Sequence, residues 1–222
     1  MTQVKICGIT NLDDARAAAE AGADMLGFVF FPRSSRYIDP ERAGEIVAAL
    51  ERLGNAPICA GVFVDELPKR VRAIAATAHL DMVQLHGNES PAMVRELGVC
   101  YPELQSIAVY KALRPQNGTE AQAQVAEYRA AANGNIPAFI VDAFDAQRFG
   151  GTGSRADWDV AACIAREFPI LLAGGLNADN VAEAIRAVRP WGVDVSSGVE
   201  RVPGLKDHDH VRRFIHKAKS LD

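Results

Sequence analysis

A thiol and a carboxylate stand at the ends of two apolar runs that are typical of buried strands. Cys7 closes the run 4–7, and Asp142 directly follows the run 138–141. A carboxylate there is costly unless it is paired or meets solvent at a rim. If both strand ends share one rim, they supply a candidate base and a candidate acid for proton transfer. Taken singly, Cys7 is more simply a small buried apolar residue, and Asp142 has a loop cap as its alternative.

Turns rich in glycine and serine follow the last three apolar runs. They are Gly150-Gly151-Thr152-Gly153, Gly174-Gly175 and Ser196-Ser197-Gly198. Backbone N–H groups that glycine leaves accessible can point at an anion, and helix N-termini add to the attraction. One such pair would simply make a turn, but two sets after consecutive strands indicate a phosphate site. The first set, with Gly151 and Gly153, either adds N–H groups or covers the site as a lid.

Three further side chains invite chemistry, each with a plainer alternative. Arg36, in the polar loop 32–39, has the geometry to hold a substrate carboxylate with both arms of its guanidinium, although loop arginines are usually solvated. His86 follows a strand and either donates to substrate or packs as a core histidine. Lys111 also stands at a predicted strand end, where it suggests a Schiff-base lysine of the aldolase type.

The elements that must position these residues alternate regularly along the chain. Eight apolar runs are predicted as strands, at 4–7, 25–30, 58–64, 82–85, 107–112, 138–141, 170–173 and 193–195. Helical patterns separate them, at about 12–21, 40–53, 67–77, from Ser90-Pro91 onward, 119–132, 157–166, up to 188, and 207–219. Continuous apolar strands indicate a parallel sheet covered by helices. We therefore predict an α/β fold, a single (β/α)8 barrel domain over residues 1–222, with a doubly wound open sheet as the alternative.

Composition limits the class of protein. The chain has 222 residues, 49% of them hydrophobic, and a net charge of −4, which argues against a nucleic-acid partner. No apolar run approaches the roughly 20 residues of a membrane helix, and the first residues lack a signal-peptide pattern. The four cysteines form no CxxC pair, so we expect neither a zinc site nor a disulfide framework. A cytoplasmic protein is predicted.

Seven segments carry a resemblance to a known family. They are KICGIT (5–10), GVFV (61–64), VQLHG (83–87), VDA (141–143), GGTG (150–153), LAGGL (172–176) and GVDVSSGVE (192–200). In this order they resemble phosphoribosylanthranilate isomerase of tryptophan biosynthesis. The match runs from one end of the chain to the other and is weakest over 98–135. The opening motif with its cysteine, together with the last motif, is specific to that family.

The resemblance implies a single-domain (β/α)8 barrel that acts without cofactor or metal. It implies an Amadori rearrangement of N-(5-phosphoribosyl)anthranilate to 1-(2-carboxyphenylamino)-1-deoxyribulose 5-phosphate. By position, Cys7 resembles the general base and Asp142 the general acid, and Arg36 would hold the anthranilate carboxylate. We expect substrate contacts also from His86, Gly151, Gly153, Gly174, Gly175, Asp194, Ser196, Ser197 and Gly198. The chain has Ser35 where the family usually has a proline.

The reaction sets expectations for protonation. A protonated Asp142 would donate to the ribose ring oxygen, and a partly apolar site would raise its pKa. A Cys7 thiolate would then remove the proton from C2′, favoured by a basic neighbour such as Lys5 or Arg36.

Two other functions compete with the isomerase. Another sugar-phosphate barrel, an aldolase or an epimerase, would need Lys111 or a metal-binding set. A non-catalytic phosphate-binding barrel would bind ligand without turnover. The expected partner is a small-molecule substrate, with no nucleic acid and no membrane, and the chain is expected to be a monomer or a homodimer.

Overall fold

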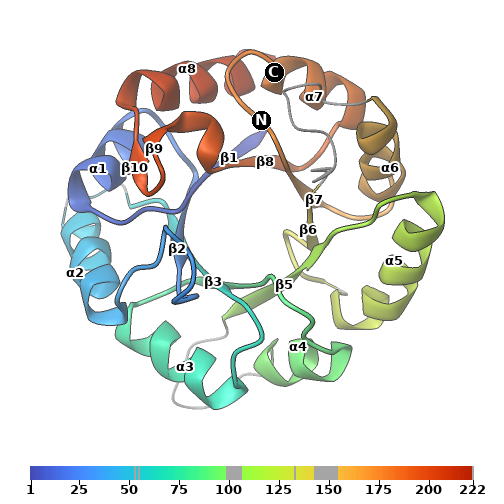
Figure 1. Ribbon diagram of the computed structural model, residues 1–222, viewed down its shortest axis with the longest axis horizontal. Helices are drawn as coiled ribbons and strands as arrows, with labels where there is room; N and C mark the ends of the chain where they lie inside the picture. Colours follow the sequence, from blue (N-terminus) through green and yellow to red (C-terminus); the bar gives the residue numbers. More distant parts are fainter. Residues whose placement is uncertain (53, 55, 99–106, 133, 143–154, 222) are drawn as a thin grey trace.

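Eight parallel strands close into a barrel, which Figure 1 shows end-on inside a ring of helices. The structure, a computed structural model, describes residues 1–222 except 53, 55, 99–106, 133, 143–154 and 222. The strands are β1 (Gln3–Cys7), β2 (Met25–Val29), β3 (Ile58–Phe63), β4 (Met82–Leu85), β5 (Ala108–Leu113), β6 (Phe139–Asp142), β7 (Ile170–Ala173) and β8 (Gly192–Val195). Closure comes from β1, in which Lys5 pairs with Met25 of β2 on one side and with Asp194 of β8 on the other. The barrel prediction is confirmed, and the open sheet is wrong.

Helices alternate with the strands as expected. They are α1 (Leu12–Glu20), α2 (Pro40–Glu51), α3 (Pro68–Thr77), α4 (Pro91–Gly98), α5 (Gly118–Ala132), α6 (Arg155–Ala165), α7 (Val181–Val188) and α8 (His208–Lys219). Side chains cap several of them, since Asn11, Asp39 and Asp207 accept hydrogen bonds from the first free N–H groups of α1, α2 and α8. Every strand begins and ends within one residue of its predicted bounds.

Alternate residues of each strand point to opposite sides of the barrel wall. Val4 and Ile6 of β1 join the large core between the barrel and its helices, whereas Lys5 and Cys7 face the interior. The lower interior is filled mainly by apolar side chains: Met25, Ala60, Tyr110, Ala112, Ile140, Leu171 and Ala173. Polar groups therefore collect above this packing, toward the carboxyl ends of the strands.

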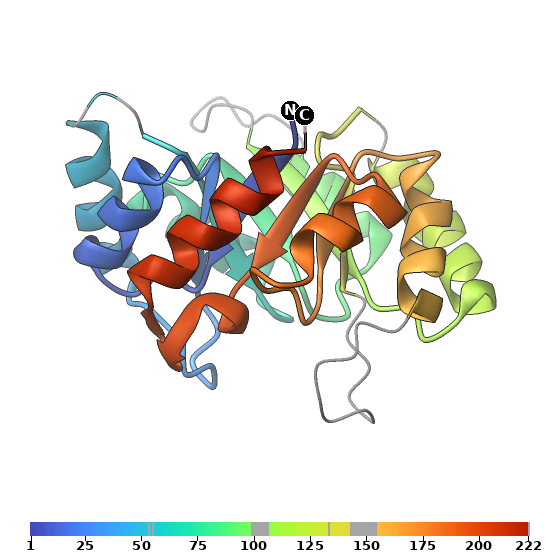
Figure 2. The same ribbon diagram turned by 90° about the horizontal axis from the view of Figure 1, so that it is seen from above.

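A small hairpin after β8 was not predicted from the sequence. A 3-10 turn, η1 (Ser197–Val199), leads into β9 (Glu200–Val202) and β10 (Leu205–Lys206), which pair antiparallel. Figure 2 shows this hairpin at the end of the barrel opposite the N-terminus, which is the end where β8 finishes. The strands are too short and too polar to show an alternating pattern in the sequence.

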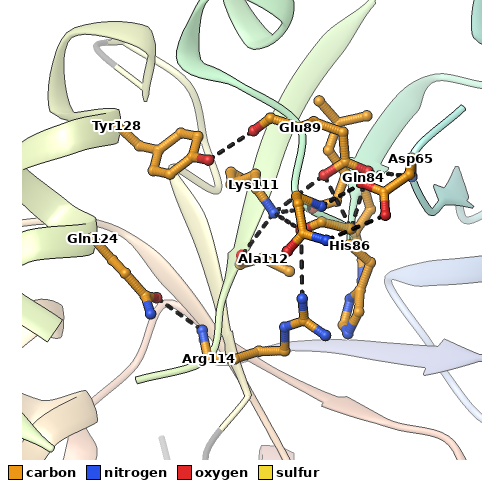
Figure 3. Close-up of polar contacts among 12 residues, drawn as sticks. Asp65, Gln84, His86, Glu89, Lys111, Ala112, Arg114, Gln124 and Tyr128 are labelled. Carbon is orange, nitrogen blue, oxygen red and sulfur yellow. Dashed lines mark hydrogen bonds and ion pairs between the residues drawn. The ribbon is translucent and has the colours of Figure 1, made fainter. Parts of the chain in front are cut away.

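Lys111 does not stand at the rim as predicted. It lies within β5 on the face turned away from the interior, and its side chain is buried. Its Nζ donates to the carbonyl oxygens of Leu85, Gly87 and Ala112, and it lies 3.2 Å from Oε2 of Glu89 (Figure 3). An amine held in this way is not available as a nucleophile, so Lys111 cannot be the Schiff-base lysine that the aldolase hypothesis needs.

The Lys111–Glu89 pair fixes the loops that follow β3 and β4. The Glu89 carboxylate accepts hydrogen bonds from the backbone N–H groups of Asp65 and Gly87, at 3.0 Å each. The hydroxyl of Tyr128 on α5 donates to the backbone oxygen of Glu89 (Figure 3). Both loops belong to the catalytic end of a (β/α)8 barrel, so this pair is a structural support for that end.

Among the described residues, no helix is long and apolar enough to cross a membrane. The same residues contain no group of three His, Cys, Asp or Glu side chains placed to hold a metal ion.

We predict that Lys111→Ala destabilises the protein strongly. Removing one partner of a buried ion pair leaves Glu89 as an uncompensated charge, which costs about 3–5 kcal/mol. Urea unfolding followed by circular dichroism measures the loss. The matched control is Lys69→Ala, which changes an exposed lysine of α3. Equal stability of the two variants would show that the buried pair contributes nothing.

Candidate active site

A cavity of about 410 Å³ opens at the carboxyl ends of the strands. Nine of the predicted site residues line it: Cys7, Arg36, His86, Asp142, Gly174, Gly175, Asp194, Ser196 and Ser197. Gly198 lies beneath the cavity wall, where a Cβ atom would collide with the carbonyl oxygen of Leu176. That glycine lets the loops after β7 and β8 approach each other. Gly151 and Gly153 lie outside the described residues.

Cys7 occupies the inward position at the end of β1, and its side chain is buried. Gly27 on β2 leaves room for the thiol, since a Cβ atom there would lie 2.6 Å from Sγ. Burial raises the pKa of Cys7, while Lys5 and then Lys206 act in the opposite direction. The expectation that Lys5 or Arg36 favours the thiolate therefore holds in direction for both, since the charges of Cys7 and Arg36 also attract each other. Desolvation outweighs it in the ligand-free enzyme.

Asp142 and His86 approach each other across the cavity mouth. Asp142 ends β6, and its Oδ2 lies 3.9 Å from Nε2 of His86, which follows β4. Burial, together with the charge of Arg114, lowers the pKa of His86 to about 4. The imidazole is therefore neutral near pH 7.

Arg36 is held in place by a residue to which the sequence had assigned no role. Its Nε and one terminal nitrogen donate to the two carboxylate oxygens of Glu200, at 2.8 and 2.7 Å. Ser34 Oγ accepts from the backbone N–H of Arg36, which closes the turn around Ser35. The Arg36 side chain is 26% exposed and borders the cavity. The loop 32–39, which has Ser35 in place of the family's proline, is thus held by the two hydrogen bonds from Arg36 to Glu200 of β9.

Lys206 is the second functional residue that sequence reasoning missed. It is fully buried in the hairpin, and its Nζ donates to the backbone oxygens of Cys7 and Ser196, at 2.5 and 3.2 Å. The same nitrogen lies 2.9 Å from Oε1 of Glu200. Burial alone would raise the pKa of Glu200, but the bonds from Arg36 and Lys206 hold it below the usual range. Glu200 stands inside the last family motif, and that was its only signal.

Asp194 lines the cavity and is paired there with a buried lysine. Its Oδ1 accepts from the buried Nζ of Lys5 at 2.7 Å, so the carboxylate forms an ion pair at the cavity floor. The same lysine donates to Oε1 of Gln84 at 2.9 Å. Burial disfavours the Lys5 cation, but Asp194 reverses this effect and leaves the pKa of Lys5 raised. Asp194 lines the cavity, yet its charge is already neutralised by the protein.

The loops after β7 and β8 carry the features of an anion site. Gly174 and Gly175 both line the cavity and have positive φ, 95° and 61°, a conformation that glycine adopts without strain. Ser196 Oγ is buried on the same side and has no hydrogen-bond partner in the part of the chain that is described. An unsatisfied buried hydroxyl is costly unless a ligand or water completes it. The arrangement suits a phosphate group.

Fold and site together are those of a (β/α)8-barrel enzyme, with a carboxyl group and a thiol lining one cavity beside two glycine- and serine-rich loops. The sequence model of the family described as N-(5'phosphoribosyl)anthranilate (PRA) isomerase matches residues 4–217. The chain belongs to this family of isomerases, which interconvert an aldose and a ketose. The aldolase, epimerase and non-catalytic alternatives are thereby set aside.

Individual members of this family are similar to the chain over its whole length. N-(5'-phosphoribosyl)anthranilate isomerase of Geobacter sp. (strain M21) is 48% identical over 221 residues and is covered completely, as is this chain. The protein of the same name from Citrifermentans bemidjiense is 47% identical, with 100% of this chain and 98% of the relative covered. A crystal structure of phosphoribosyl anthranilate isomerase from Thermotoga maritima superposes with a TM-score of 0.86 at 40% identity, with both chains fully covered. Another crystal structure of a phosphoribosyl anthranilate isomerase, in complex with reduced 1-(o-carboxyphenylamino)-1-deoxyribulose 5-phosphate, gives a TM-score of 0.83 at 40% identity, with both chains fully covered.

An unperturbed cysteine has a pKa of about 8.5. We predict that the pKa of the Cys7 thiol lies above this value when no substrate is bound. Burial favours the neutral thiol, so the thiolate fraction grows only as the pH rises through the raised pKa. Thiolate absorbance at 240 nm, taken as the difference between wild type and Cys7→Ala from pH 6 to 11, reports this residue alone. A midpoint at or below about pH 8.5, the ordinary cysteine value, would contradict a raised pKa.

Proposed function

We propose that Cys7 and Asp142 are the general base and general acid of the isomerase reaction, the rearrangement of N-(5-phosphoribosyl)anthranilate to 1-(2-carboxyphenylamino)-1-deoxyribulose 5-phosphate. The observation that carries the proposal is that Cys7 and Asp142 are the last residues of their strands and that both side chains line one cavity. The thiol comes from β1 and the carboxyl from β6, so a substrate in the cavity lies within reach of both.

The reaction begins with two proton transfers. Protonated Asp142 donates to the ribose ring oxygen, the ring opens, and the nitrogen lone pair forms an iminium. The Cys7 thiolate then removes the proton from C2′ to give an enolamine. The enolamine tautomerises to the ketone as the 2′ hydroxyl loses its proton and C1′ gains one. Lys5 and Lys206 both favour the thiolate, and a bound substrate that excludes water strengthens their effect on the charge.

The two anionic ends of the substrate define its orientation. Arg36 binds the anthranilate carboxylate with the donors that Glu200 leaves free. The phosphate binds at the loops after β7 and β8, where Gly174 and Gly175 offer backbone N–H groups and Ser196 supplies a hydroxyl. Gly151 and Gly153 remain predicted phosphate contacts from the loop after β6.

The remaining proposals concern the protein as a whole. Residues 1–222 act as one catalytic domain, as a monomer or homodimer in the cytoplasm, without nucleic-acid partner, cofactor or metal. The negative net charge supports the absence of a nucleic-acid partner.

We predict that Cys7→Ala and Asp142→Asn each lower kcat by several orders of magnitude, because each acid–base role contributes about 10²–10⁴-fold. The substrate is formed in situ and its fluorescence is followed as it is consumed. Cys59→Ala is the matched control, since Cys59 is buried in β3 but does not line the cavity. A fully active Cys7→Ala would overturn the role of the thiol.

Arg36→Ala is expected mainly to raise KM, because the guanidinium binds substrate and transition state alike. The control is Arg33→Ala, which removes an exposed arginine from the same loop. Steady-state kinetics with both variants separates binding from turnover. An unchanged KM for Arg36→Ala would show that this loop does not hold the carboxylate.

A further inference from the structure

We propose that Gln84 is a positioning residue that fixes the proton of the neutral His86 imidazole on Nε2, the nitrogen that faces Asp142. The inference rests on the proposed function and deepens it, because it places an N–H donor of His86 next to the general acid Asp142. It rests on a chain of contacts that begins at the buried Lys5 and ends at the cavity mouth.

The orientation of the Gln84 amide follows from the chemistry of its neighbours. Lys5 Nζ lies 2.9 Å from one end of the amide, and an ammonium group only donates hydrogen bonds. The atom facing it must therefore be the oxygen, Oε1. Tyr110 contributes a second donor, with its hydroxyl 3.1 Å from the same atom. This assignment does not depend on telling nitrogen from oxygen in the amide.

The other end of the amide fixes the tautomer of His86. Gln84 Nε2 carries two N–H donors and lies 2.8 Å from Nδ1 of His86, so Nδ1 must accept. In a neutral imidazole the remaining proton is then on Nε2. An imidazolium would place its own Nδ1–H against the amide N–H, which adds to the burial that already holds the pKa of His86 near 4.

The fixed proton points toward the general acid. His86 Nε2 lies 3.9 Å from Oδ2 of Asp142, longer than a hydrogen bond but within reach of a small side-chain rotation. When Asp142 gives its proton to the ring oxygen, the carboxylate that forms meets an N–H donor. With the opposite tautomer it would meet a lone pair. Gln84 thus selects the form of His86 that stabilises the charge developing on Asp142.

The groups around His86 support a neutral donor. Arg114 and Lys111 of the β5 segment and Lys5 of β1 bring positive charge toward it, and Asp194 of β8 brings negative charge. Of these, Lys5 and Asp194 pair with each other, and Lys111 pairs with Glu89. Figure 3 shows the neighbouring polar cluster that fixes the His86 loop from the outer side of the barrel.

The test is a long-range nitrogen–proton NMR spectrum of the imidazole side chains in the ¹⁵N-labelled full chain, which has five histidines. The His86 signals are those missing from His86→Asn. The expected pattern is the pure Nε2–H tautomer, unchanged between pH 6 and 8. A pure Nδ1–H tautomer, a mixture, or protonation within this range would overturn the proposal, and the wild-type spectrum alone decides this.

Gln84→Glu reverses the polarity at the Nδ1 contact. A carboxylate accepts only, so His86 should place a proton on Nδ1, as the Nδ1–H tautomer or the imidazolium, and kcat should fall by about 10–100-fold with little change in KM. Gln122→Glu, on the exposed face of α5, makes the same chemical change away from the site and should leave spectrum and kcat as in wild type. A folded Gln84→Glu variant with His86 still in the pure Nε2–H form would overturn the proposal. A wild type with the expected tautomer but no isomerase activity would instead refute the proposed function.

Discussion

The ion pair between Lys5 and Asp194 is the constraint on which the interior of the barrel depends. Lys5 is fully buried, and its Nζ reaches β8 through Asp194 and β4 through Gln84, which in turn binds Tyr110 of β5. A charge at that depth is tolerated only when its donors are satisfied by well-placed acceptors. Because Lys5 and these partners come from four strands, β1, β4, β5 and β8, the pair couples the closure of the barrel to the shape of the cavity floor.

Two other buried lysines, Lys206 of β10 and Lys111 of β5, are likewise paired with carboxylates and hold loops in place. Lys206 binds the backbone oxygen of Cys7 and the carboxylate of Glu200, and Glu200 fixes Arg36. Lys111 is on the outer face of β5 and holds the loops after β3 and β4 through Glu89. Lys111, which the sequence suggested as a nucleophile, and Lys206 thus both fix loops around the site through their hydrogen bonds and ion pairs.

The fold could be predicted almost completely from the sequence, because continuous apolar strands and cap residues such as Asn11 and Asp39 act locally. The membership of Cys7, His86 and Asp142 in one site also followed, since strand ends converge in a parallel barrel. The pairing of Glu200 with Arg36 did not follow. It joins residues 164 positions apart through a hairpin with no hydrophobic pattern. Lys111 was predicted at a strand end, but β5 continues to Leu113, and Lys111 lies on the opposite face from the interior residues Tyr110 and Ala112.

The charges around the thiol explain how a buried cysteine can still serve as a base. Three cations lie near Cys7, namely Lys5, Lys206 and Arg36, and the described carboxylates paired with them are Asp194 and Glu200. This leaves one positive charge in excess. In the free enzyme desolvation dominates and the thiol stays neutral. Arg36 also attracts the thiolate, but a substrate carboxylate bound to it would offset that positive charge. Lys5 and Lys206 are buried, so they keep their effect on the Cys7 thiolate when the substrate is bound.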